Sequence, residues 1–254
     1  MSGTAIEVED VTMAFSGLFA LSHVSLSLPR GAIVGLIGPN GSGKTTLLNC
    51  MSGVYRPTGG QIRLDGRYLT RSSSSEVACL GIRRTFQQSL LVPSLTALEN
   101  VLVGAHRQIS GDPLSAALTL WPLRRAESRE RAKALSILKW LGIDHLANVR
   151  ADSIAGPARK LVELARAIIA DPTYLLLDEV ASGLNSAEKE TLARRLREFR
   201  SRSDALVLLV EHDLDFVMAL ADRVVVLNSG LLIADGSPSE VQRNTEVIGA
   251  YIGA

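Results

Sequence analysis

The sequence lacks most features that mark extracellular or metal-binding proteins. It has 254 residues but only two cysteines, Cys50 and Cys79, and these have no metal-ligand spacing. We expect both to be buried or half-buried thiols in a reducing compartment. The first ten residues are acidic and have no apolar core, so we expect no signal peptide.

Long hydrophobic runs and an excess of one charge are also missing. The longest apolar run, Ala205–Val210, has the length of a strand and falls far short of the roughly 18 residues of a membrane span. With 27 basic and 26 acidic residues the net charge is only +1, which argues against a protein that works mainly on nucleic acid. We therefore expect any membrane role to come through a partner.

The hydrophobic pattern predicts an α/β fold. Alternation around Ile6–Val8 and Val24–Leu28 predicts antiparallel strands, and the continuous apolar run Ala32–Ile37 predicts a buried parallel strand. The region 93–166 has a helical pattern, and helical segments separate the later strands. A hairpin is expected at Gln61–Gly66 and further strands at Tyr174–Leu177, Leu206–Val210 and Arg223–Leu227.

A glycine-rich loop follows the predicted buried strand. Gly38–Thr45 matches G-x-x-x-x-G-K-[ST] and precedes a helical pattern. Glycines let backbone N–H groups turn toward phosphate oxygens, and the positive end of a helix favours the same anion. Lys44 can reach the outer phosphates and the Thr45 hydroxyl can bind Mg²⁺. This context disfavours a purely structural glycine turn. The expected nucleotide contacts are Asn40, Gly41, Ser42, Gly43, Lys44, Thr45 and Thr46.

Two carboxylates and a histidine follow predicted strands further along the chain. Asp178 and Glu179 end an apolar run, where α/β sheets bind ligands, and His212 follows another. Asp178 can hold Mg²⁺ and Glu179 can orient or deprotonate a water. An acid at a strand end is weak evidence alone, and a lone histidine is usually structural. Together with the phosphate loop they favour a hydrolytic site, with His212 contacting the γ-phosphate.

Two further residues are candidates on weaker grounds. Gln87 lies where the chain leaves the predicted core for the helical region, and its amide can sense Mg²⁺ or the attacking water. Phe15 is one of few early aromatic residues, and its ring can stack on adenine. Packing in the core remains the alternative for Phe15.

In this order and spacing, five motifs resemble the ATP-binding-cassette (ABC) family over essentially the whole chain. Gly38–Thr45 resembles the family's Walker A loop and Tyr174–Glu179 its Walker B motif. Gln87 resembles the Q-loop glutamine, His212 the switch histidine and Phe15 the adenine-stacking aromatic. The resemblance implies an ATPase that uses ATP and Mg²⁺.

The resemblance also implies roles and boundaries. The implied catalytic residues are Glu179, His212 and Gln87. The implied metal-binding residues are Thr45, Gln87 and Asp178. The fold would be a P-loop (RecA-like) ABC core with an N-terminal antiparallel β subdomain and an inserted α-helical subdomain. Within one domain, 1–254, the nucleotide-binding core would comprise 1–87 and 161–254, and the helical signature subdomain 88–160.

Several sequence segments resemble one branch of the family, the importers of branched-chain or hydrophobic amino acids. They are Arg84–Gln87, Gly183–Asn185, Val210–Asp213, Val247–Gly253 and the extra helical stretch near Asp112 to Arg131. This resemblance implies a peripheral subunit on the cytoplasmic face of the plasma (inner) membrane, with no nucleic acid partner. Its partners would be two transmembrane permease subunits, a second ABC ATPase and a solute-binding protein. Urea, short amides and aromatic acids remain alternative solutes.

One motif departs from the family, whose signature reads Leu-Ser-Gly-Gly-Gln. Here Ala155 replaces the serine, which removes a hydroxyl donor, and Pro157 replaces the second glycine, which removes an N–H. Gly156 is kept, and Ala158 replaces the glutamine. Because each ATP in the family lies between one Walker loop and the other subunit's signature, we expect an asymmetric heterodimer. Val180, where proline is common, has no physical explanation.

These departures leave two alternatives to a hydrolysing transporter subunit. A non-hydrolysing switch would bind ATP to dimerise, but intact Glu179 and His212 argue against it. An ABC ATPase acting on DNA or ribosomes is disfavoured by the balanced charge and by the lack of coiled coils or a second cassette.

Overall fold

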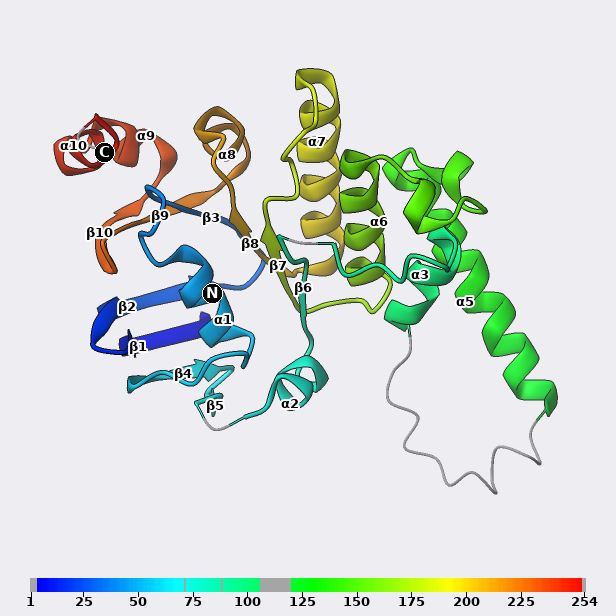
Figure 1. Ribbon diagram of the computed structural model, residues 1–254, viewed down its shortest axis with the longest axis horizontal. Helices are drawn as coiled ribbons and strands as arrows, with labels where there is room; N and C mark the ends of the chain where they lie inside the picture. The colour runs from blue at the N-terminus through cyan, green and yellow to red at the C-terminus, as the bar shows by residue number, and fades with distance from the viewer. Residues whose placement is uncertain (1–3, 71, 88, 106–119, 253–254) are drawn as a thin grey trace. The chain divides into compact units, whose positions relative to one another are not determined.

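The computed structural model describes residues 4–70, 72–87, 89–105 and 120–252 (Figure 1). Its strands are β1 (Thr4–Phe15), β2 (Leu18–Pro29), β3 (Ile33–Ile37), β4 (Gly59–Leu64), β5 (Arg67–Tyr68), β6 (Ile82–Arg84), β7 (Tyr174–Asp178), β8 (Leu206–Val210), β9 (Arg223–Asn228) and β10 (Leu231–Gly236). Its α-helices are α1 (Lys44–Met51), α2 (Ser74–Cys79), α3 (Ala97–Ala105), α5 (Leu120–Leu141), α6 (Gly156–Ile168), α7 (Ser186–Ser203), α8 (Leu214–Leu220), α9 (Pro238–Arg243) and α10 (Thr245–Ile252). Short 3₁₀ turns lie at Asp144–Leu146 and Ala151–Ser153.

The chain divides by packing into two compact units. The first comprises residues 1–84, 173–179 and 186–254, and the second 85–172 and 180–185. This division places residues 161–172 with the helical region, whereas the family resemblance implied that the nucleotide-binding core resumes at 161.

A six-stranded sheet forms the centre of the first unit. Its order is β10-β9-β3-β8-β7-β6, and every neighbouring pair from β9 to β6 is parallel, while β10 runs antiparallel to β9. Every residue of β3, β7 and β8 is buried, as expected of strands covered on both faces. The predicted parallel strands are therefore confirmed, and their carboxyl ends share one edge.

A second, antiparallel sheet completes this unit, with the order β2-β1-β4-β5. Buried and accessible residues alternate along much of β2, so that one face of the sheet is covered and the other is not. Leu47 and Leu48 of α1 belong to the same buried cluster as Ile6 of β1 and Val34 of β3. The predicted N-terminal antiparallel strands and the hairpin are both confirmed.

Helices make up most of the second unit. Gly104 of α3 lies so close to α6 that an added Cβ would come within 2.0 Å of the Arg166 carbonyl oxygen. In α6, buried Glu163 accepts a 2.6 Å hydrogen bond from the Leu90 N–H, and Arg166 donates to the Leu90 carbonyl at 2.8 Å. The predicted helical region is thus confirmed where the structure describes it; the stretch expected near Asp112 lies partly outside the described residues.

The two cysteines differ in exposure. Cys50 is buried in α1, but Cys79 at the end of α2 is exposed, so the prediction that both thiols are at least half-buried is wrong for Cys79. The side chains of this short surface helix point largely outward, with only Val77 buried. Among the described residues, no helix is both long and apolar enough to cross a membrane.

Candidate nucleotide and hydrolysis site

The phosphate loop connects β3 to α1, and its backbone requires glycine. Gly43 caps the helix with φ +102°, and an added Cβ would lie 2.5 Å from the Ala20 carbonyl oxygen. At Gly38, with φ +149°, a Cβ would lie 2.0 Å from the Leu227 carbonyl oxygen. The loop therefore packs closely against β2 and β9. Helix α1 begins at Lys44, so the N–H groups of its first turn lie at the loop.

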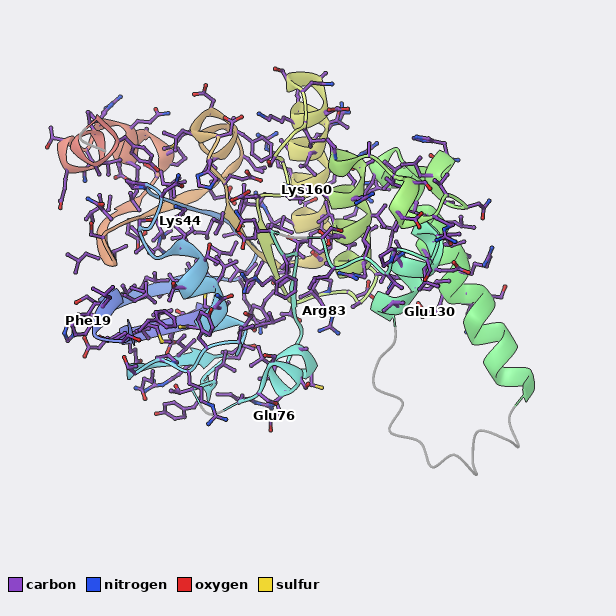
Figure 2. All side chains as sticks on the ribbon, in the orientation of Figure 1. Phe19, Lys44, Glu76, Arg83, Glu130 and Lys160 are labelled. Carbon is purple, nitrogen blue, oxygen red and sulfur yellow. The ribbon has the colours of Figure 1, made fainter. Side chains whose placement is uncertain are left out.

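Lys44 lies at the start of α1 (Figure 2), and its ammonium is folded into the loop. It donates to the carbonyl oxygens of Gly38 at 2.7 Å and Pro39 at 2.8 Å. Burial lowers its pKa, and the nearby charges of Asp178 and Glu179 oppose that shift. The loop thus holds a strong donor close to both Walker B carboxylates.

The remaining loop residues differ in accessibility. Asn40, Gly41 and Thr45 are exposed and Thr46 is half-buried, so these groups can meet a ligand. Ser42 is only 2% exposed and packs beneath the loop. We retain all of them as proposed nucleotide contacts.

Asp178 ends β7 as a buried carboxylate paired with an arginine. Arg84, the last residue of β6, donates from Nη2 to Asp178 Oδ2 at 3.1 Å. Its Nη1 donates to Asn49 Oδ1 at 2.6 Å and to Ser52 Oγ at 3.1 Å, which ties the carboxylate to the end of α1. Burial raises the pKa of Asp178, and Arg84 opposes this.

Arg84 had no role in the sequence-based site. Arg84 ends β6, a short strand that the sequence analysis did not predict, and nothing in the spacing predicts that β6 and β7 are neighbours. The pairing therefore emerges only from the register, in which Arg84 lies opposite Leu176.

Glu179 follows β7 in an uncommon backbone conformation. Its φ is +52°, in the left-handed region that glycine favours, and its N–H donates to the Val210 carbonyl oxygen at 2.9 Å. His212 follows β8, the parallel neighbour of β7, and its Nε2 lies 3.0 Å from Glu179 Oε1. The structure thus brings together the two groups expected to orient water and contact the γ-phosphate.

The residues present fit Mg²⁺ bound with a nucleotide. The described residues contain no cluster of three or more His, Cys, Asp or Glu able to hold a metal alone. Mg²⁺ at nucleotide sites needs only one or two protein oxygens, because phosphates and waters supply the rest. The buried carboxylate of Asp178 and the exposed hydroxyl of Thr45 are the candidates within the first unit.

Phe15 is exposed, which removes the core-packing alternative. It is 42% exposed at the end of β1, and its ring meets Tyr55 edge-on with 5.3 Å between centroids. Tyr55 was not predicted as a site residue. Its backbone N–H is held by the carbonyl oxygen of Asn49 at the end of α1.

Gln87 and the signature-like segment belong to the second unit. Gln87 is exposed. Ala155 is the residue before α6 and makes no side-chain cap, and Pro157 lies in the first turn, where its missing N–H costs no helical hydrogen bond. Ala155 and Gly156 are exposed and Ala158 is half-buried. The segment therefore starts a helix without the hydroxyl that a serine would supply.

Comparison with known families identifies the architecture. Residues 21–182 match the family model described as ABC transporter, which spans the phosphate loop, the Walker B carboxylates and the signature-like segment. The chain belongs to the ABC transporter family. It is an ATPase of the kind that couples hydrolysis to transport. Residues 232–254 match a second model, described as branched-chain amino acid ATP-binding cassette transporter.

Known ABC proteins resemble the chain over its full length. The high-affinity branched-chain amino acid transport ATP-binding protein LivG of Salmonella typhimurium is 40% identical over 253 residues, covering 100% of this chain and 99% of LivG. BraF of Pseudomonas aeruginosa, which carries the same description, is 39% identical over the same shares. A crystal structure of a nucleotide-free ATP-binding cassette from an ABC transporter has a TM-score of 0.85 at 29% identity, covering 99% of this chain and 100% of that one.

Proposed function

We propose that this ABC ATPase powers an importer of branched-chain or related hydrophobic amino acids. The full-length similarity to LivG and BraF supports the solute class. The observation that carries the hydrolytic role is the 3.0 Å contact between Glu179 and His212 at the edge of the sheet that holds Asp178.

The chemistry follows from where each side chain lies. Glu179 orients and polarises the attacking water, and His212, within hydrogen-bond distance of Glu179, steadies the γ-phosphate. Lys44 turns its donors from the loop carbonyls to the phosphates. Asp178 and Thr45 would hold Mg²⁺, which supplies charge neutralisation at the phosphates. The exposed ring of Phe15 would stack on adenine, and the amide of Gln87 is the proposed sensor of Mg²⁺ or the attacking water.

The signature-like segment supports an asymmetric pair of ATPases. Ala155 has no hydroxyl and Pro157 has no N–H that could bind a partner's ATP. The Walker residues of this chain would therefore support hydrolysis, whereas its signature-like segment would bind the partner's ATP poorly. The ATP bound by Lys44 and Asp178 would be hydrolysed with the partner's signature. The other ATP would turn over slowly and hold the dimer closed.

Restoring the signature tests this asymmetry. In the heterodimer, Ala155→Ser with Pro157→Gly should raise turnover at the partner's Walker site, measured with this chain's own site silenced by Glu179→Gln. The matched control is the same Glu179→Gln chain with Ala155 and Pro157 unchanged. No rise over that control would reject the asymmetry.

The degenerate signature favours a second candidate, a non-hydrolysing switch. Such a subunit would bind ATP, close the dimer and leave the chemistry to its partner. Nucleotide binding with no dependence of turnover on Glu179 would support the switch over the hydrolysing subunit.

The proposed assembly places the chain on the cytoplasmic face of the plasma membrane. Two permease subunits and a second ATPase would complete the complex, and a solute-binding protein would deliver the amino acid. The test is uptake of radiolabelled leucine into vesicles that hold the reconstituted complex and internal ATP, with unlabelled valine, urea and a short amide as competitors. Inhibition of leucine uptake by valine but not by urea is expected; no leucine uptake, or inhibition by urea but not by valine, would reject the solute class.

A further inference from the structure

Arg84 pairs with Asp178, the buried carboxylate at the end of β7 that is a candidate metal ligand. Its guanidinium lies 3.1 Å from Asp178 Oδ2, and the exposed fractions of the two side chains are 5% and 2%. A pair so shielded from water interacts far more strongly than an exposed one. Asp178 therefore has a fixed positive neighbour at its Oδ2 oxygen.

The arginine is itself held in place from a second direction. Asn49 and Ser52 accept hydrogen bonds from Nη1, while Nη2 binds the carboxylate. These acceptors lie on and just after α1, the helix that begins at the phosphate loop. The guanidinium thus links the Walker B strand to the Walker A helix within the first unit.

A divalent cation and a guanidinium compete for the same carboxylate oxygens. Both are attracted by the charge of Asp178, and each repels the other at short range. A metal that binds Asp178 must either displace Arg84 from Oδ2 or accept a positive charge beside it. Arg84 is also the last residue of the first unit before the chain continues to Gln87.

We propose that Arg84 is a positioning residue that holds Asp178 and competes with Mg²⁺ for its Oδ2 oxygen. Binding of the metal–nucleotide complex moves the Arg84 guanidinium off Asp178 and weakens its hydrogen bonds to Asn49 and Ser52. This competition lowers the affinity of the site for the metal. It also means that metal binding changes the contacts of Arg84 at the end of β6. This inference rests on the proposed nucleotide site.

The test measures how much a metal strengthens nucleotide binding, without hydrolysis. The dissociation constant of a fluorescent, non-hydrolysable ATP analogue is measured for the purified chain in EDTA and in Mn²⁺, and the ratio is the metal-dependent gain. Arg84→Gln removes the competing charge, so the gain should rise about tenfold. Arg84→Lys keeps the positive charge but loses the two-nitrogen geometry, so its gain should rise less than that of Arg84→Gln.

Arg83 provides a matched control one residue away (Figure 2). Its Nη1 donates to the backbone carbonyl oxygens of Ala78 and Ile82, at 2.5 and 2.8 Å. Arg83→Gln should leave the gain unchanged. An Arg84→Gln gain equal to or below wild type would overturn the proposal, because a merely structural arginine would lower the gain or leave it alone.

A milder variant covers the case in which Arg84→Gln does not fold. Asn49→Ala removes one anchor of the guanidinium and keeps its charge, so the metal should displace it more easily and the gain should rise about two- to threefold. No rise would then overturn the proposal. Failure of the wild-type chain to bind the analogue in both EDTA and Mn²⁺ would reject the nucleotide site itself, which separates the two failures.

Discussion

His212 Nε2 lies 3.0 Å from Glu179 Oε1, although the two residues come from different strands of the sheet. The histidine side chain is 50% exposed and the glutamate side chain 16% exposed. The contact joins an accessible ring, which can meet a ligand, to a carboxylate largely shielded from water. Because β7 and β8 are parallel neighbours, their carboxyl ends bring both groups to one place.

His212→Ala should reduce ATP turnover in the assembled transporter by about 10²- to 10³-fold, because it removes both the proposed phosphate contact and the partner of Glu179. Nucleotide affinity should change by less than about threefold, since the loop and Lys44 are untouched. Steady-state turnover and analogue binding separate the two effects. Turnover within about twofold of wild type would reject this role for His212.

The left-handed backbone at Glu179 predicts a stability difference between two substitutions. Glu179→Gly relieves the steric cost of φ +52°, whereas Glu179→Ala retains it, and the added freedom of unfolded glycine offsets part of the gain. The glycine variant should be more stable by about 0.5–1 kcal/mol in urea unfolding without nucleotide. An equal or more stable alanine variant would show that this conformation carries no strain.

The two thiols should react very differently. Burial raises the pKa of Cys50 to about 11, so at pH 8 almost none of it is the reactive thiolate, while Cys79 is exposed. A disulfide reagent at pH 8 should therefore modify one thiol per native chain and two per unfolded chain. The Cys79→Ser variant should lose the fast reaction entirely. Rapid labelling of that native variant would contradict the burial of Cys50.

The sequence predicted the strands and the loop whose form depends on hydrophobic pattern and on glycine. The continuous apolar runs became β3, β7 and β8, and glycine at Gly38 and Gly43 marked a loop whose backbone admits no side chain. The expected neighbourhood of Glu179 and His212 needed only the rule that strands separated by helices form a parallel sheet.

Features that depend on strand order could not be read from the chain. The ion pair of Arg84 with Asp178 requires β6 to lie beside β7, and the contact of Phe15 with Tyr55 requires the end of β1 to lie near the end of α1. The left-handed turn at Glu179 was also not predicted, because glutamate has no preference for that conformation.

The most direct test of the account is ATP turnover of the complex with its membrane and ATPase partners, with Glu179→Gln in this subunit only. The amide keeps the size of the side chain but cannot polarise water as a carboxylate does. Turnover should fall by at least about 100-fold while ATP still binds. Turnover within about twofold of wild type would contradict it, and would make the chain a nucleotide-holding switch whose partner performs the hydrolysis.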